Sequence, residues 1–345
     1  MRAVKLVAPH TLALREAPTP ALGPEDVLVE IAGAGLCHSD LHLLDSPRPP
    51  FLGGTIGHEG AGKVASMGSG VEGLRIGDPV LVNLVYSCGR CRACVEGREN
   101  ACQVTGTRLR PPTTPGLGTD GAMAEYLAVN ARHLDTIAGL DPVLAAPLAD
   151  AGTTPMHAIN SVRSRLTPGA TVVVIGVGGL GHVGLQILKA TSAVRVIAID
   201  SDEAKRELAG RLGADLVLGS GPDTARRVLE LTGGYGADVV LDFVAVQPTV
   251  DLAVDSIAPE GLLRFIGLGG GTFTYRSAAD TGRLPWGVDI RRSYGGTRAD
   301  QRQVIELARQ GRIEMKVQTY PIEEFQRACD DLAAGRVLGR AVVVP

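Results

Sequence analysis

Hydrophobic and polar positions follow different patterns in the two parts of this chain. Up to about residue 140, short apolar and β-branched runs bounded by Gly and Pro predict strands joined by irregular loops. Beyond that point, apolar runs alternate with amphipathic stretches of helical periodicity. Such alternation is typical of a parallel sheet covered by helices on both faces. The pattern therefore predicts a strand-rich part followed by an α/β part.

The strand-rich part begins with a predicted strand over residues 1–9. A helix of roughly residues 141–162 leads out of it. Two loops, 46–54 and 106–121, are rich in Pro and Gly, and long loops of this kind often line a site. The other strands predicted here are 26–36, 60–67, 78–83 and 126–134.

Six strands are predicted in the second part, which fits a doubly wound parallel sheet. Helices such as 202–212 and 223–231 separate them. The tail, 298–345, reads as helix, strand, helix, strand, and we expect it to rejoin the first domain because its last strand lies beyond the sixth strand of the sheet. The six strands are 171–176, 194–200, 215–218, 237–243, 262–267 and 289–294.

Composition and charge exclude several classes of protein. A chain of 345 residues has room for two domains. A net charge of −3, with only 5 Phe, 6 Tyr and 1 Trp, gives neither a basic nor a base-stacking surface for nucleic acid, and no polybasic membrane patch. The apolar stretch 170–188 is punctuated as strand, turn and helix, so we interpret it as buried structure. Six cysteines without an export signal favour a reducing cytoplasm.

Four cysteines lie within fifteen residues, at Cys88, Cys91, Cys94 and Cys102. Four thiolates at this spacing suit a closed, tetrahedral zinc site of the structural kind. Two disulfides or four unrelated thiols are the alternatives, but a chain of this size needs no covalent staples to fold. The segment predicts a lobe held together by zinc.

A glycine-rich turn follows the first strand of the α/β part. Gly176 allows the tight turn, Gly178 lets the backbone approach a pyrophosphate, and Gly181 lets the helix pack on the strand. The strand before, the helix after and Asp200 at the end of the next strand are the context that a dinucleotide site requires. The Asp200 carboxylate would bind the adenosine ribose and repel a 2′-phosphate, and Ser201 offers that phosphate no cation. These features predict NAD.

A second group of metal-ligand types is spread more widely. Cys37 follows a predicted strand, and His58 follows the loop 46–54. A catalytic zinc needs about three protein ligands and an open position. Two residues are candidates for the third ligand: Asp150, which ends an apolar run, and Glu59.

These segments together resemble the zinc-dependent alcohol dehydrogenases of the medium-chain dehydrogenase/reductase superfamily. The resemblance runs over essentially the whole length and is carried by CHSDLH, GHEGAGKVASMGSGV, the four-cysteine lobe, DAGTT and GVGGLG. It implies a GroES-like, mostly β catalytic domain over residues 1–151, with the zinc lobe at 86–104. A Rossmann domain would follow over 152–294, and residues 295–345 would return to the catalytic domain.

The resemblance also implies roles for individual residues. Cys37, His58 and Asp150 would bind the catalytic zinc, and Glu59 would be the nearby carboxylate that can enter its shell. Plant and animal members have a second cysteine where this chain has Asp150. Bacterial secondary alcohol dehydrogenases commonly have Asp there, which favours secondary alcohols and ketones as substrates. The implied NAD contacts are His38 and Arg340 at the pyrophosphate, Thr154 beside the nicotinamide, the turn Gly176, Gly178, Gly179, Leu180 and Gly181, and the groove residues Phe243, Val244, Gly267 and Leu268.

The implied reaction is reversible hydride transfer between an alcohol and NAD, with zinc acting as a Lewis acid on the substrate oxygen. The proton released would pass through Ser39 and a cofactor ribose hydroxyl to His42, whose alternative reading is a solvated helix residue. We expect two zinc ions and one NAD per chain.

Two other functions remain open at this stage. The chain could be a polyol or sugar dehydrogenase of the same superfamily, or a non-catalytic NAD-binding redox sensor. The predicted partners are a small alcohol or ketone and further copies of the chain, as a homodimer or homotetramer. The strand 289–294 is a plausible pairing edge for such an assembly.

Overall fold

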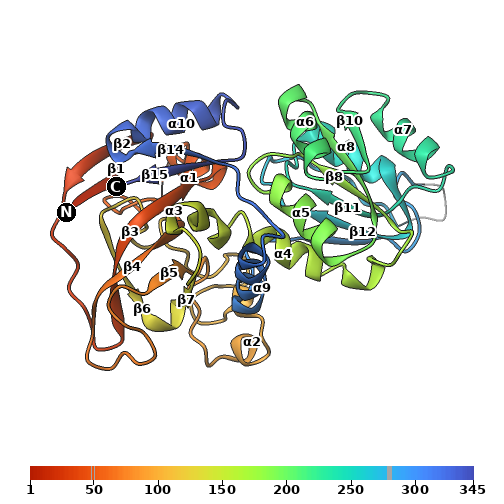
Figure 1. Cartoon of the computed structure of the whole chain (residues 1–345). Helices are drawn as coiled ribbons and strands as arrows, with labels where there is room; N and C mark the ends of the chain where they lie inside the picture. Colours follow the sequence, from red (N-terminus) through yellow and green to blue (C-terminus); the bar gives the residue numbers. More distant parts are fainter. Residues whose placement is uncertain (48, 50, 278–281) are drawn as a thin grey trace. The chain divides into compact units, whose positions relative to one another are not determined.

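The computed structural model describes residues 1–47, 49, 51–277 and 282–345, so two positions of the predicted loop 46–54 lie outside the described residues. The chain forms two compact units (Figure 1). The first unit consists of Met1–Thr153, Gly295–Gly311 and Met315–Pro345, and the second of Thr154–Tyr294 and Arg312–Glu314.

The first unit is mostly β, as the pattern of short apolar runs predicts. A hairpin of β1 (Arg2–Ala8) and β2 (Thr11–Glu16) accompanies a seven-stranded sheet of order β14-β15-β3-β4-β5-β7, in which β6 also pairs with β3. Alternate residues of the long strand β3 are buried, which places Val27, Val29 and Ile31 in one apolar core. The strands are β3 (Asp26–Leu36), β4 (Glu59–Met67), β5 (Pro79–Val82), β6 (Tyr126–Asn130), β7 (Leu134–Thr136), β14 (Val317–Pro321) and β15 (Arg340–Val344).

The C-terminal tail completes the sheet of the first unit. The predicted order of helix, strand, helix, strand is observed as α9 (Arg298–Arg309), β14, α10 (Phe325–Ala333) and β15. Strand β15 pairs with β14 on one side and with β3 on the other, and Figure 1 shows these C-terminal elements beside the N-terminal strands. The last strand in the sequence is therefore an interior strand of the sheet.

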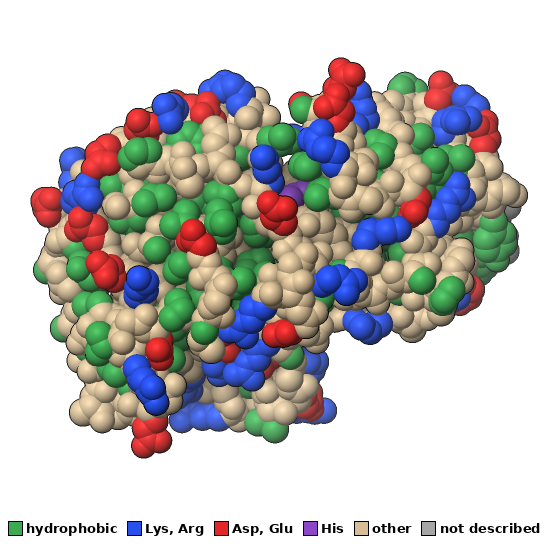
Figure 2. Space-filling view, in the orientation of Figure 1, with side chains coloured by type: hydrophobic (Ala, Val, Ile, Leu, Met, Phe, Trp, Pro, Cys, Tyr) green, Lys and Arg blue, Asp and Glu red, His purple; other side chains and the backbone are tan. Residues whose placement is uncertain are grey.

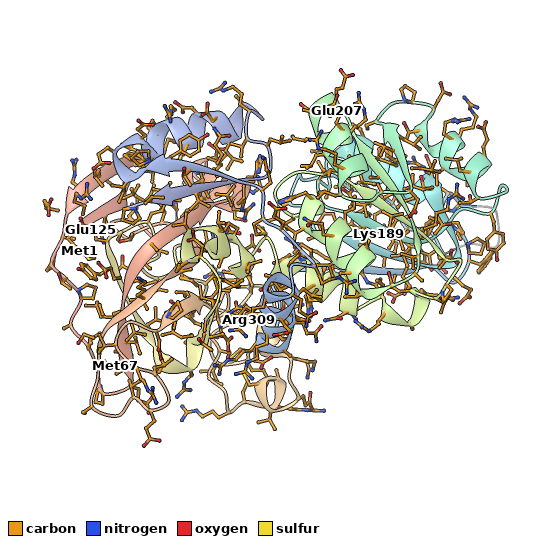
Figure 3. The ribbon with its side chains drawn as sticks, in the orientation of Figure 1. Met1, Met67, Glu125, Lys189, Glu207 and Arg309 are labelled. Atoms are coloured by element: carbon orange, nitrogen blue, oxygen red, sulfur yellow. The ribbon has the colours of Figure 1, made fainter. Side chains whose placement is uncertain are left out.

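Helix α9 is fixed to strand β7 by polar contacts. The buried Asp135 carboxylate accepts hydrogen bonds from Arg298, Arg302 and Gln301 of the helix. At the other end, Arg309, labelled in Figure 3, donates to the carbonyls of Thr136 and Ala138. These contacts pair a buried carboxylate with arginines, and such pairing offsets the free-energy cost of burying a charge.

The second unit has the predicted doubly wound sheet. All of its strand pairs are parallel, and the strand order is β10-β9-β8-β11-β12-β13. This is the order of a dinucleotide-binding sheet, with the first strand at its centre. Strand β8 is buried along its whole length, which explains its continuous apolar run. The strands are β8 (Thr171–Ile175), β9 (Arg195–Asp200), β10 (Leu216–Gly219), β11 (Ala237–Asp242), β12 (Ile257–Phe265) and β13 (Asp289–Arg292).

Helices connect the strands of this sheet, as the amphipathic periodicity predicts. Four of them are α5 (Gly181–Thr191), α6 (Glu203–Arg211), α7 (Thr224–Leu231) and α8 (Gln247–Ser256). The prediction of a doubly wound α/β fold is confirmed.

The predicted helix over residues 141–162 is wrong in its middle. The chain forms a short helix α3 (Pro142–Ala145), a 3₁₀ turn at Ala146–Ala149 and a separate helix α4 (Thr153–Asn160). Pro147 has no N–H to continue an α-helix, and Gly152 is packed so closely against Leu148 and Val304 that a side chain would not fit. The interruption leaves Asp150 in the non-helical segment between α3 and α4.

The charge distribution gives no single-sign field on the face shown in Figure 2, where Lys and Arg alternate with Asp and Glu. Within the described part of the chain, no helix combines the length and the apolarity that a membrane span requires.

Candidate functional site

Three side chains from distant parts of the first unit converge on one buried point. Cys37 follows β3, His58 directly precedes β4, and Asp150 lies in the interruption between α3 and α4. The Asp150 Oδ2 atom is 3.6 Å from Cys37 Sγ and 3.5 Å from His58 Nε2. With metal–ligand bonds of about 2.0–2.3 Å, the donors of a tetrahedral site lie about 3.3–3.8 Å apart. The three donors therefore fit one zinc ion.

Asp40 orients the histidine of this cluster, a role that the sequence analysis did not assign. Its Oδ1 lies 3.2 Å from Nδ1 of His58, and its Oδ2 accepts the Cys37 backbone N–H at 2.9 Å. A carboxylate on one ring nitrogen leaves the other, Nε2, directed at the metal position. Asp40 is the third residue of α1 (His38–Leu44), where a side chain normally caps the helix. The sequence feature that could have indicated this role is the position of Asp40 within the CHSDLH segment, close to Cys37.

Glu59 and Arg340 form a buried ion pair beside the cluster. Arg340 donates to both oxygens of Glu59, at 2.8 and 2.6 Å, and also to Asp150 Oδ2 at 3.1 Å. Gly35, opposite Glu59 on the neighbouring strand, leaves the space that the carboxylate occupies. Glu59 does not belong to the group of donors that converge on the metal position. As the structure stands, Arg340 binds these carboxylates and is 2 % exposed.

The electrostatics of the cluster favour an additional positive charge. The carboxylates of Asp40, Glu59 and Asp150 are buried together, and the guanidinium of Arg340 binds two of them. Burial lowers the pKa of His58, but Asp40 and Asp150 outweigh it and raise that pKa well above its usual range. A field that favours a cation in this position is the field that a divalent metal requires.

The four predicted lobe cysteines also converge in the first unit. The sulfur atoms of Cys88 and Cys94 are 4.0 Å apart, those of Cys91 and Cys94 are 3.5 Å apart, and those of Cys91 and Cys102 are 3.9 Å apart. A disulfide requires about 2.05 Å, whereas four sulfurs around one zinc lie about 3.8 Å apart. All four are free thiols. The set has four donors and leaves no open position, as a structural zinc requires.

The glycine-rich turn of the second unit has the geometry of a phosphate-binding loop. Gly176 has a φ of 85°, and a side chain on Gly181 would collide with the Gly176 carbonyl. A Cβ on Gly178 would meet nothing within 4 Å, so the backbone is open to a ligand there. Gly179 and Leu180 complete the turn, and Leu180 gives α5 no side-chain cap. The positive end of the helix dipole at this terminus favours an anion.

Asp200 ends β9 beside this turn. Its Oδ2 accepts the Val177 N–H at 2.7 Å, and its Oδ1 accepts the Asp202 N–H at 2.9 Å. The carboxylate is therefore held at the carboxyl end of the strand next to β8, where the ribose of a dinucleotide lies in this fold.

The other predicted groove residues lie at the ends of β11 and β12. A side chain on Gly267 would approach the backbone of Val244 to 2.3 Å, so the two loops are in direct contact. The Phe243 ring packs beside Gly184 of α5, and Leu268 is about half exposed.

Comparisons with known proteins show the family to which the chain belongs. The sequence pattern of the alcohol dehydrogenase GroES-like domain matches residues 23–138, and that of the zinc-binding dehydrogenase family matches residues 179–310. An alcohol dehydrogenase of Geobacillus stearothermophilus is 34 % identical over 340 residues, which is 96 % of this chain and 95 % of the relative. The chain belongs to the zinc-dependent alcohol dehydrogenases. The predicted family and its two-part fold are confirmed.

Solved structures of two dehydrogenases and one reductase are similar to this chain over its whole length. The alcohol dehydrogenase of Aeropyrum pernix has a TM-score of 0.92 at 35 % identity, with all of both chains covered. A D-arabinose dehydrogenase of Sulfolobus solfataricus has a TM-score of 0.83 at 30 % identity, over 100 % of this chain and 99 % of that one. An acetophenone reductase of Geotrichum candidum in complex with NAD has a TM-score of 0.88 at 30 % identity, over 100 % of this chain and 97 % of that one.

The remaining predicted residues of this zinc-dependent dehydrogenase lie close to the metal cluster or at the start of the second unit. Ser39 Oγ is 3.8 Å from Cys37 Sγ, and Ser39 is partly exposed. His38 and His42 belong to the same helix, α1, and both are exposed. Thr154 is a buried residue of α4. The functional roles of these residues stay predictions.

Proposed function

We propose that this protein is an NAD-dependent alcohol dehydrogenase and ketone reductase. The observation that supports it most is the convergence of Cys37, His58 and Asp150 at tetrahedral spacing in a chain of this family. The first unit is the catalytic part and holds the lobe 86–104, and the second binds the cofactor. The tail from residue 295 contributes to the catalytic part.

The zinc ion supplies Lewis-acid polarisation of the substrate oxygen, and NAD supplies the hydride acceptor. Cys37, His58 and Asp150 hold the ion, and Cys88, Cys91, Cys94 and Cys102 hold a second, structural ion. Asp40 keeps the Nε2 atom of His58 directed at the metal position. Arg340 neutralises Glu59 and so keeps this carboxylate from adding a further negative charge next to the ligands. We keep Glu59 as an alternate ligand that would first have to leave Arg340.

The proton path begins at Ser39, the hydroxyl next to Cys37. In our proposal Ser39 accepts the proton of the alcohol and His42 releases it to water, and a ribose hydroxyl of bound NAD would supply the link between them. The exposure of His42 supports this role, since the last group of a relay must exchange protons with water.

His42→Gln should lower the rate of alcohol oxidation most at and below neutral pH. General-base assistance is worth about 10²–10⁴-fold, and hydroxide replaces a missing base as the pH rises, so the deficit should shrink in alkaline buffer. The measurement is kcat across a pH series, with zinc content and NAD affinity as controls. A profile parallel to that of the wild type would show that His42 is only a surface residue.

Cofactor choice rests on Asp200. The variant Asp200→Gly/Ser201→Arg should shift the preference from NAD toward NADP, because it removes a carboxylate that repels the 2′-phosphate and adds a cation that can bind it. We expect the ratio of kcat/KM for the two cofactors to change by about 10² or more, measured with one alcohol at fixed pH. Equal use of NADP by the wild-type enzyme would contradict this role of Asp200.

The substrate is proposed to be a secondary alcohol or the corresponding ketone. Asp150 as the third ligand and the similarity to an acetophenone reductase support this choice. The similarity to a D-arabinose dehydrogenase supports a second candidate, a sugar or polyol. NAD⁺ reduction measured over primary, secondary, cyclic and polyhydroxy alcohols separates the two, and no reduction with any of them by zinc-loaded protein would contradict both.

We also propose a cytoplasmic location and a homodimer or homotetramer. The six free thiols support a reducing compartment. Strand β13 pairs with β12 on one side only and ends the sheet, so it offers an edge to a second copy. Light scattering on the purified protein measures the assembly.

A further inference from the structure

A buried carboxylate in the second unit has no role in the reaction described above. Asp242 is the last residue of β11, and it is 0 % exposed. Its Oδ1 accepts two backbone N–H groups, from Val244 and Ala245, both at 2.9 Å. Burial raises the pKa of Asp242, and these two donors oppose the shift. A buried acceptor used twice by one loop indicates that the loop conformation depends on it.

The loop needs such support because its backbone is unfavourable. Ala245 has a φ of 57°, in the left-handed region that residues other than glycine avoid. In that conformation the Cβ atom of an L-amino acid lies too close to the following carbonyl oxygen. The hydrogen bond from the Ala245 N–H to Asp242 is therefore a local compensation for strain at the same residue.

The same loop holds the next loop of the sheet in place. The N–H of Gly269 donates to the Val244 carbonyl at 3.1 Å, and the N–H of Gly271 donates to the Ala245 carbonyl at 2.8 Å. The Gln247 side chain bonds both the N–H and the carbonyl of Thr272. These hydrogen bonds join the loops after β11 and β12. Because Asp242 fixes the conformation of the first loop, it also fixes the position of the second.

The position of these loops in the sheet identifies the half of the cofactor that they face. A doubly wound sheet consists of two mononucleotide-binding halves, and the cofactor crosses the carboxyl ends of the strands where the order reverses. Strands β8 and β9 carry the glycine turn and Asp200, which serve the pyrophosphate and the adenosine ribose. Strands β11 and β12 form the other half, so their loops face the nicotinamide nucleotide.

We propose that Asp242 is a positioning residue that fixes the two loops receiving the nicotinamide half of NAD. This inference rests on the proposed function, since it requires that the second unit bind NAD. Asp242 acts through the backbone of Val244 and Ala245 and touches neither the substrate nor the reacting atoms.

The test compares binding of NADH with binding of ADP, which has the adenosine half of the cofactor alone. Asp242→Leu removes the acceptor and should raise the Kd of NADH at least tenfold, while the Kd of ADP changes less than about twofold; a tenfold change is about 1.4 kcal/mol. Asp242→Asn keeps an oxygen in the place of Oδ1 and should restore NADH binding to near the wild-type value. The loop variant Ala245→Val, with a β-branched residue at a positive φ, should reproduce the selective loss without altering the strand.

A control variant separates positioning from general destabilisation. Val239→Ala removes buried methyl groups from the same strand, away from the loop, and should lower the melting temperature with NADH binding kept. Wild-type NADH affinity in both Asp242→Leu and Ala245→Val would overturn the inference, and so would equal losses of NADH and ADP binding. Wild-type protein that binds no NADH would instead contradict the proposed function itself.

Discussion

Cys37→Ser is expected to remove at least about three orders of magnitude from kcat/KM for alcohol oxidation. Losing the Lewis acid removes several kcal/mol of transition-state stabilisation, and about 4 kcal/mol corresponds to roughly 10³-fold. The serine oxygen is a poor substitute for a thiolate ligand, so the zinc content should fall from two ions per chain to one. Steady-state kinetics and metal analysis of the same preparation measure both effects.

Cys329→Ala is the matched control for this variant. Cys329 is a buried cysteine of α10 that belongs to neither group of metal donors. We expect it to keep both zinc ions and most activity. NADH binding should be unchanged in Cys37→Ser, since the second unit is untouched. A Cys37→Ser enzyme that retains two zinc ions and most of its activity would refute the assignment of the catalytic metal.

Cys94→Ala should affect stability and leave the chemistry largely intact. A closed four-sulfur site has no position for substrate, and structural zinc contributes directly to the folding free energy. We expect a melting temperature lower by about 10 °C or more, since a domain of this size loses about 2–4 °C per kcal/mol. Activity per folded molecule at low temperature should stay near that of the wild type.

The readouts for this variant are calorimetry and zinc content, with Cys329→Ala again as the control for the loss of a buried sulfur. A Cys94→Ala protein that melts like the wild type and carries the same amount of zinc would show that the lobe is not held together by metal.

The parts of the fold that the sequence predicts best are those in which one physical constraint dominates. The strands of the second unit are buried on both faces, so they are apolar runs that stand out between amphipathic helices. The predicted strand 126–134 is different, because the chain leaves β6 through a 3₁₀ turn at Ala131–His133 that Asn130 caps. In the sequence, an asparagine inside an apolar run looks like an ordinary strand residue, because its hydrogen bond to the backbone of the following turn depends on the folded geometry.

Some residues of the site can be predicted from the sequence, and others cannot. The lobe cysteines are close in sequence, so their spacing predicts their convergence. Asp150 converges with Cys37 because α3 stops at Ala145 and the 3₁₀ turn that follows ends at Ala149, whereas the sequence pattern there predicts a continuous helix. Asp40 and Asp242 act through hydrogen bonds to their neighbours, and such roles depend on backbone geometry that residue types do not reveal.

The interior position of β15 has a consequence for biosynthesis. The N-terminal strands are synthesised first, whereas β15, the strand that lies between β3 and β14, follows much later. The same segment carries Arg340, the cation that neutralises Glu59 and contacts Asp150. Until it emerges, the carboxylates of the metal site lack this cation, and residues 34–36 of β3 lack their partners in β15. An unpaired stretch of strand edge is a hazard for aggregation in a nascent chain. The catalytic part therefore depends on a late segment of the chain, because residues 34–36 of β3 and the Glu59 carboxylate reach their partners in β15 only once that strand has been synthesised.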